Sequence, residues 1–234
     1  GKVSRREFLR LSALVGASVG AAAIIPALGP SLVRASTPRR GGVLKVASVV
    51  HKMSNPAQIS WGKVSNILRQ VAEYLTITGT DNITRPLLAK DWQASDDLKT
   101  WTFNLRQGIK FNNGDEFTAD DLVFTLKMWL DKDVMSSMLG LVGDYLSPDG
   151  IEKIDNYQVK LHLNRPEIGL PEHFYHYPAF ILNHRTFNGD FRKAPHGTGP
   201  YTLETYKETE IAVLKARKDY WQKGADGKPL PYLD

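Results

Sequence analysis

Length, composition and charge already exclude several classes of protein. The chain has 234 residues, of which 42% are hydrophobic and 24% charged, and this balance is typical of a folded chain rather than of a disordered or collagen-like one. The net charge is +5, but residues 1–35 contain five of the 30 basic residues and only one of the 25 acidic residues. The rest of the chain is therefore nearly neutral. The net charge does not indicate a nucleic-acid partner.

The first 35 residues have the order of an export signal. "SRREFLR", which contains Arg5 and Arg6, matches the twin-arginine consensus, and an uncharged stretch rich in Ala and Gly follows it. Small residues then precede a cleavage site that we predict after Ala35. The alternative is an uncleaved membrane anchor, but the stretch is only weakly hydrophobic. The chain contains no cysteine, so we expect no lipid anchor and no disulfide.

The next segments predict a strand followed by a helix. Residues 36–42 form a short polar linker, and "VLKVASVV" (residues 43–50) is rich in β-branched residues, which favours a strand. A loop follows. Apolar residues then recur at helical spacing from Lys63 to Leu75. A strand, a loop and a helix in this order predict an α/β layer.

The middle of the chain predicts strands around one clear helix. Apolar and polar residues alternate in "LKTWTFNLR" (residues 98–106), as in a half-buried strand. Asn113-Gly114 predicts a tight turn. A helix is expected from Thr118, with Asp121 in place of the usual Glu or Gln of a capping box. We therefore assign Asp121 and its acidic neighbour to the helix start rather than to catalysis.

Two further pairs of strands are expected. One pair surrounds Asp155-Asn156 within residues 151–164, where apolar residues again alternate with polar ones. The other is expected within residues 201–221. No internal repeat is evident. For the middle of the chain, these elements predict a meander of strands with one helix packed on it.

Two long motifs resemble a known family. "LLAKDWQASDDLKTWTFNLRQGIKFNNGDEFTADDLVFTL" (residues 87–126) is similar to the signature of family 5 solute-binding proteins of ABC importers, the group of dipeptide- and oligopeptide-binding proteins. "GTGPYTLETYK" and "VLKARKDYW" (residues 197–207 and 213–221) are similar to a later block of that family. Family members are more than twice as long as this chain.

The resemblance implies an α/β fold of the type II periplasmic binding protein kind, with the second main lobe missing from this sequence. Residues 43–78 would begin the first lobe, residues 79–183 would form a smaller inserted domain, and residues 184–234 would return to the first lobe. Such proteins capture a peptide or another small polar solute in the periplasm and deliver it to a membrane permease. We accordingly expect a monomer without enzymatic activity, catalytic residues or cofactor.

The resemblance also places ligand contacts on two loops. They are the loop after the first predicted strand and a loop of the smaller domain, and an extended peptide needs polar, charged and stacking partners there. Each aromatic residue among them could equally be a core or surface residue. The predicted ligand-binding residues are His51, Met53, Asn55, Trp61 and Tyr145.

Other candidate sites are weaker. His173 and His176 in "HFYH" could suggest a metal or haem site, but no carboxylate-histidine pattern of known ligand spacing accompanies them, so we predict no metal site. "GTGPY" lacks the Lys-Ser/Thr of a phosphate loop and predicts a turn that packs closely against backbone.

Two other functions remain open from the sequence. One is a periplasmic enzyme exported by the twin-arginine route, and the other is a sensory module that binds a membrane receptor. The export signal alone supports the enzyme, and no nucleophile motif such as G-x-S-x-G accompanies it.

Overall fold

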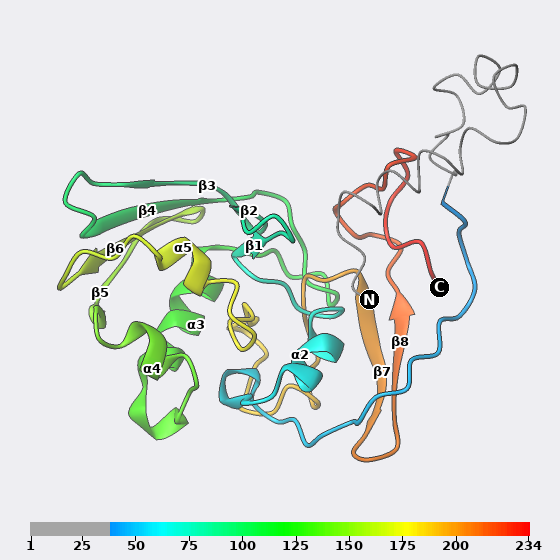
Figure 1. Ribbon diagram of the computed structural model, residues 1–234. Helices are drawn as coiled ribbons and strands as arrows, with labels where there is room; N and C mark the ends of the chain where they lie inside the picture. The colour runs from blue at the N-terminus through cyan, green and yellow to red at the C-terminus, as the bar shows by residue number, and fades with distance from the viewer. Residues whose placement is uncertain (1–37) are drawn as a thin grey trace, which may run out of the picture. The chain divides into compact units, whose positions relative to one another are not determined.

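The computed structural model describes residues 38–234, and Arg39–Asp234 form one compact unit (Figure 1). The strands of this part make three antiparallel sheets. The largest has the order β3 (Ala89–Ala94), β4 (Thr100–Leu105), β6 (Gln158–Leu163) and β5 (Leu146–Asp155); β1 (Thr76–Thr78) pairs with β2 (Thr84–Pro86), and β7 (Tyr201–Lys207) with β8 (Ile211–Ala216). The helices are α2 (Gly62–Leu68), α3 (Ala119–Leu130), α4 (Leu139–Val142) and α5 (Leu170–His173), with short 3-10 turns η3 (Pro56–Gln58) and η4 (Lys132–Val134).

The four-stranded sheet and α3 form the core of the middle segment. Trp101, Phe103 and Leu105 of β4 point inward while the residues between them are partly exposed, so the predicted alternation is confirmed. The helix α3 packs on β5 and β6 through a stripe that includes the buried Leu122 and Trp129. The predicted strand pair around Asp155-Asn156 is also confirmed. Within the described residues, no helix is long and apolar enough to cross a bilayer.

The predicted turn and the predicted second strand pair are present as well. Gly114 has a φ of 93°, and its N–H donates to the carbonyl of Phe111, which closes the turn at Asn113-Gly114. A left-handed φ is the conformation for which glycine is favoured. The β7–β8 hairpin occupies the segment in which a strand pair was expected.

The first predicted strand is wrong for the described residues. Residues 43–50 form no strand, and the side chains of Val43, Leu44 and Val46 are 81%, 67% and 73% exposed. Backbone bonds hold only the ends of this segment, where Gly42 accepts from Asp234 and Val50 accepts from Thr209. β-branched residues favour extended backbone, but a strand also needs a neighbouring strand. No segment of residues 38–234 supplies that neighbour.

The predicted helix over residues 63–75 is shorter than expected. It ends at Leu68 because the backbone beyond Arg69 bonds to other parts of the chain. The carbonyl of Gln70 accepts from the N–H of Tyr201, and the carbonyl of Val71 accepts from the N–H of Gly199. Long-range pairing therefore replaces the last two turns that the apolar spacing predicts.

We call the meeting point of four segments the central junction. It comprises residues 70–72, 110–112 and 197–201 together with Arg217. The Arg217 side chain is buried, and its terminal nitrogens donate to the carbonyls of Gly197 and Gly199 at 3.3 and 3.2 Å and to that of Lys110 at 3.1 Å. A side chain with five donors can hold several carbonyls at once. The predicted close packing of "GTGPY" is confirmed here, because a Cβ on Gly197 would lie 1.9 Å from the Val71 carbonyl oxygen.

A buried carboxylate lies beside the central junction. Glu73 accepts from the hydroxyl of Tyr220 at 2.6 Å and from the indole N–H of Trp221 at 3.0 Å. Burial raises the pKa of Glu73, while the bonds from Tyr220 and Trp221 oppose this rise. These bonds join the segment after α2 to the "DYW" motif near residue 220.

Replacing Gly197 with Ala tests the central junction. The new methyl group would collide with the backbone of Val71, so we expect the free energy of unfolding to fall by about 3 kcal/mol or more. Urea denaturation of the full chain measures this change. Gly140→Ala is the matched control: Gly140 lies in α4 with open space around it, so its replacement should raise the stability by up to about 1 kcal/mol. Equal stability of the two variants would contradict the close packing at Gly197.

Candidate functional site

The loop between His51 and Trp61 is held by its own side chains. The Oδ1 atom of Asn55 accepts from the N–H of Ala57 at 3.0 Å and so caps η3. Its Nδ2 atom lies 3.7 Å from the sulfur of Met128 in α3. The Asn55 amide is therefore occupied inside the protein.

This loop packs on the segment that follows α3. The carbonyl of Ala57 accepts from the N–H of Ser137 at 2.9 Å and from the hydroxyl of Ser136 at 3.1 Å. The hydroxyl of Ser137 donates to the carbonyl of Ile59 at 2.8 Å. Three hydrogen bonds thus join two loops into one surface, which we call the loop wall and define as residues 51–61 and 131–138.

Two large apolar side chains project from the loop wall. Trp61 is 68% exposed at the start of α2, and Met135 is 74% exposed with a left-handed φ of 53°. A non-glycine residue in this conformation is uncommon and is found in turns and functional sites. An indole and a thioether at the surface can stack on or pack against a bound solute.

A second group, the Arg69 cluster, comprises Arg69, Tyr74, Tyr175, His176 and Tyr177. The hydroxyl of Tyr74 donates to the carbonyl of Tyr177 at 3.2 Å, and its ring meets that of Tyr175 edge-on at 5.2 Å. The Arg69 guanidinium lies 5.9 Å from the centre of the Tyr74 ring and donates to the hydroxyl of Ser65 at 3.2 Å. The end of α2 is thereby tied to the loop after α5.

Arg69 carries a charge that no carboxylate balances within residues 38–234. Its Nε atom is buried and has no acceptor there. Burial and the neighbouring His173 lower the pKa of His176, so this imidazole favours its neutral form. An unpaired guanidinium beside a tyrosine ring suits a ligand carboxylate, such as a peptide terminus.

The structure divides the five predicted ligand residues into two groups. Met53, Asn55 and Tyr145 are buried. The hydroxyl of Tyr145 bonds to Nδ1 of His173 at 2.7 Å, and burial raises the pKa of this tyrosine. Little of these three side chains is accessible to a solute in the described part of the chain. His51 and Trp61 are partly or largely exposed and stay candidates for ligand contact.

Sequence reasoning missed Arg69 and Tyr177. Arg69 and Glu73 are four residues apart, which on a helix would make them an ion pair. Because α2 ends before them, Glu73 turns inward to Tyr220 and leaves Arg69 without that partner. The aromatic run around "HFYHY" was the one available signal for the Arg69 cluster.

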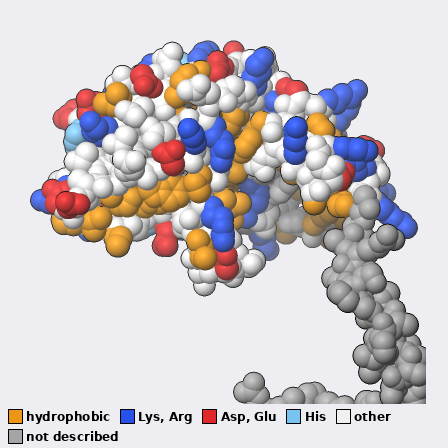
Figure 2. All heavy atoms as spheres, turned by 90° about the horizontal axis from the view of Figure 1, so that it is seen from above, with side chains coloured by type: hydrophobic (Ala, Val, Ile, Leu, Met, Phe, Trp, Pro, Cys, Tyr) orange, Lys and Arg blue, Asp and Glu red, His pale blue; other side chains and the backbone are white. Residues whose placement is uncertain are grey.

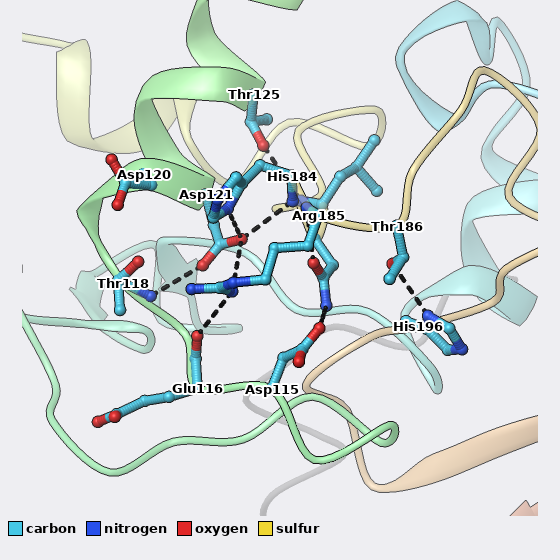
Figure 3. Close-up of polar contacts among 12 residues, drawn as sticks. Asp115, Glu116, Thr118, Asp120, Asp121, Thr125, His184, Arg185, Thr186 and His196 are labelled. Carbon is cyan, nitrogen blue, oxygen red and sulfur yellow. Dashed lines mark hydrogen bonds and ion pairs between the residues drawn. The ribbon is translucent and has the colours of Figure 1, made fainter.

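The start of α3 organises a separate polar centre (Figure 3). The carboxylate of Asp121 is fully buried and accepts from the N–H of Thr118 at 2.8 Å. It also accepts from the N–H of His184 and lies 2.8 Å from Nδ1 of that residue. Arg185 approaches the same carboxylate at 3.9 Å. The predicted helix-start role of Asp121 is confirmed, and the residue additionally anchors the chain that returns near residue 184.

The histidines do not gather into one site. In the part of the chain that the structure describes, no three side chains of His, Cys, Asp or Glu are placed to hold a metal ion. His162 bonds to Glu152, and His196 bonds to Thr186.

A comparison with protein families assigns the chain. Residues 84–234 match the model of bacterial extracellular solute-binding proteins, family 5 (middle region), and this match covers more than half of the sequence. The chain belongs to this family. Its members and the matched relatives are binding proteins rather than enzymes.

Curated relatives of this family 5 chain bind different small solutes. It is 33% identical over 160 residues to di/tripeptide-binding protein 1 of Pseudomonas aeruginosa (strain UCBPP-PA14), covering 58% of this chain and 30% of the relative. It is 34% identical over 155 residues to the nickel-binding periplasmic protein of Escherichia coli (strain K12), and this match covers 64% of this chain and 29% of the relative. The chain thus spans about 30% of the length of the relatives it matches.

Solved structures confirm the predicted fold class. The periplasmic binding protein DppA from Helicobacter pylori, in complex with the peptide STSA, matches with a TM-score of 0.71 and 27% identity over 84% of this chain and 42% of that chain. The oligopeptide-binding protein AppA from Bacillus subtilis, in complex with a nonapeptide, matches with a TM-score of 0.71 and 26% identity over 85% and 40%. The family 5 chain has the α/β fold of type II periplasmic binding proteins.

Replacing Asp121 with Asn tests the polar centre of this family 5 chain. The amide keeps the shape of the carboxylate but not its charge-assisted bonds, so we expect a loss of about 2 kcal/mol in the free energy of unfolding. Asp120→Asn is the control, because its ion pair with Lys153 is exposed and should contribute less than about 1 kcal/mol. Similar losses in urea denaturation of both variants would contradict a special role for Asp121.

Proposed function

We propose that this chain captures di- or tripeptides, or similarly small polar solutes, outside the cytoplasmic membrane and delivers them to an ABC transporter permease. The observation that carries the proposal is the loop wall together with the unpaired Arg69 in a chain of the solute-binding family. Relatives named for di- and tripeptides support this size of ligand. We further infer that the chain catalyses no reaction.

Each part of the surface would recognise a different part of a short peptide. Trp61 and Met135 would pack against side chains or the peptide plane, and His51 would offer a polar contact. Arg69 would bind the terminal carboxylate through its guanidinium. A peptide terminus that replaces water at a half-buried Arg makes a charge-assisted bond, which is stronger than a bond between neutral groups.

We also propose a division of the chain into lobes. Residues 43–78 and 184–234 would belong to the first lobe, and residues 79–183 to the smaller inserted domain. The four-stranded sheet and α3 lie within the second range, which supports the division. This chain spans about 30% of the length of its relatives. The additional residues of a relative could form a second lobe that closes over the other side of the ligand.

We propose that residues 1–35 direct export by the twin-arginine route, with cleavage after Ala35. Arg5, Arg6 and Ala35 lie outside the described residues, so the sequence order of basic, apolar and small residues is the support for this proposal. The mature chain would then act in the periplasm without residues 1–35, which carry most of the net charge of +5.

Peptide binding is tested by calorimetry of the full chain with Ala-Ala-Ala. We expect Arg69→Gln to weaken binding about tenfold, because a charge-assisted bond to the peptide carboxylate is lost. Lys63→Gln removes an exposed charge from α2, the helix that ends just before Arg69, and should change the affinity less than about twofold. With Ala-Ala-Ala-amide, which lacks the carboxylate, the two variants should bind alike. Absence of heat with every di- and tripeptide tried at millimolar concentration would overturn the proposal.

Export is tested separately with lysine substitutions. The twin-arginine route reads the arginine pair itself, so replacing Arg5 and Arg6 with Lys should leave the chain in the cytoplasm. Arg10→Lys is the matched control and should be exported normally. Cell fractionation measures the distribution, and N-terminal sequencing of the exported form should begin at Ser36. Normal export of the double variant would exclude the twin-arginine route.

A further inference from the structure

We infer that a groove beside the β1–β2 hairpin is a second binding site, for a small molecule that carries a carboxylate. The groove has a volume of about 470 Å³, which falls in the range of small-molecule sites. Figure 2 shows Lys and Arg side chains beside hydrophobic ones on the face that it draws. The residues that line the groove are likewise both basic and apolar. The residues that line it include Arg85, Pro86, Leu87, Arg106, Trp221 and Lys223.

Arg106 presents free donors to the groove. Its Nε atom donates to the carbonyl of Leu87 at 2.7 Å, and its guanidinium lies 5.3 Å from the centre of the Trp221 ring. Its two terminal nitrogens have no acceptor among residues 38–234. A planar guanidinium with both terminal nitrogens free matches the two oxygens of a carboxylate.

The ring under Arg106 is fixed from the interior. The indole N–H of Trp221 donates to the buried carboxylate of Glu73 at 3.0 Å, and the same carboxylate accepts from Tyr220. Trp221 is therefore held at its edge while its face carries the guanidinium. Binding an anion here requires little reordering of the protein, which favours affinity.

The charge balance of the groove favours an anion. Arg85 forms a two-bond ion pair with Asp81, so it adds no free charge. Lys223 is exposed and has no carboxylate partner in the described part of the chain. No acidic side chain lines the groove. Arg106 and Lys223 thus leave two uncompensated positive charges.

The groove also has an apolar part. Pro86, Leu87 and the indole of Trp221 can cover the hydrocarbon portion of a ligand whose carboxylate meets Arg106. None of these residues belongs to the loop wall or to the Arg69 cluster. The site therefore stands apart from the proposed peptide site.

The test is a titration of the full chain with benzoate and, in parallel, with the neutral benzamide. The indole N–H signal of Trp221 in nuclear magnetic resonance spectra, assigned by its loss in Trp221→Phe, reports binding. We expect benzoate to shift this signal and benzamide to leave it unchanged. Arg106→Lys keeps the positive charge but loses the two terminal nitrogens that can bind both carboxylate oxygens, so it should lower the affinity for benzoate about tenfold.

Two further variants complete the design. Lys223→Gln should lower the affinity for benzoate about threefold. Lys90 is an exposed lysine outside the groove, so Lys90→Gln should leave this affinity unchanged. Equal shifts with benzoate and benzamide would overturn the inference. If Arg106→Lys fails to fold, an unchanged benzoate affinity in Lys223→Gln would overturn it instead. The peptide test depends on Arg69 and the benzoate test on Arg106 and Trp221. A negative result at one proposed site therefore leaves the proposal for the other site intact.

Discussion

The described part of the protein depends on the contact between the backbone of residues 70–72 and the glycine-rich turn at residues 197–201. Gly197 and Gly199 leave no room for a side chain there, and Arg217 holds both of their carbonyls from the other side. An early, a middle and a late segment of the chain meet at this point. Two glycines and one buried arginine thus fix the geometry from which α2 and the loop wall extend.

The same contact explains how the candidate site is formed. Because the backbone after Arg69 bonds to residues 199 and 201, α2 ends early and Glu73 is directed inward. Glu73 then orders Tyr220 and Trp221, while Arg69 is left beside the Tyr74 ring without a carboxylate partner. One backbone pairing therefore provides a buried anchor on one side and an unpaired cation on the other. The separation of Arg69 from Glu73 therefore underlies both proposed binding sites. Arg69 stays free for the peptide carboxylate, and Glu73 positions Trp221 at the groove.

Local patterns predicted the elements whose partners lie near in sequence. The alternation in β4, the turn at Gly114 and the capped start of α3 need only short-range information, and all three are present. Elements that need distant partners were predicted less well. The segment at residues 43–50 has β-branched residues but no neighbouring strand, and α2 loses its last turns to long-range bonds. Burial of Tyr145 and Met53 depends on the packed core and likewise could not be read from the sequence.

Hydrogen exchange of the full chain, with and without saturating Ala-Ala-Ala, tests the central claim most directly. The account predicts slower exchange of backbone amides in residues 51–61 and 131–138 and in the loop at residues 175–177, since the ligand would shield and order these segments. Exchange in the β7–β8 hairpin should stay unchanged. Unaltered exchange throughout the loop wall, or protection confined to the hairpin, would contradict the account.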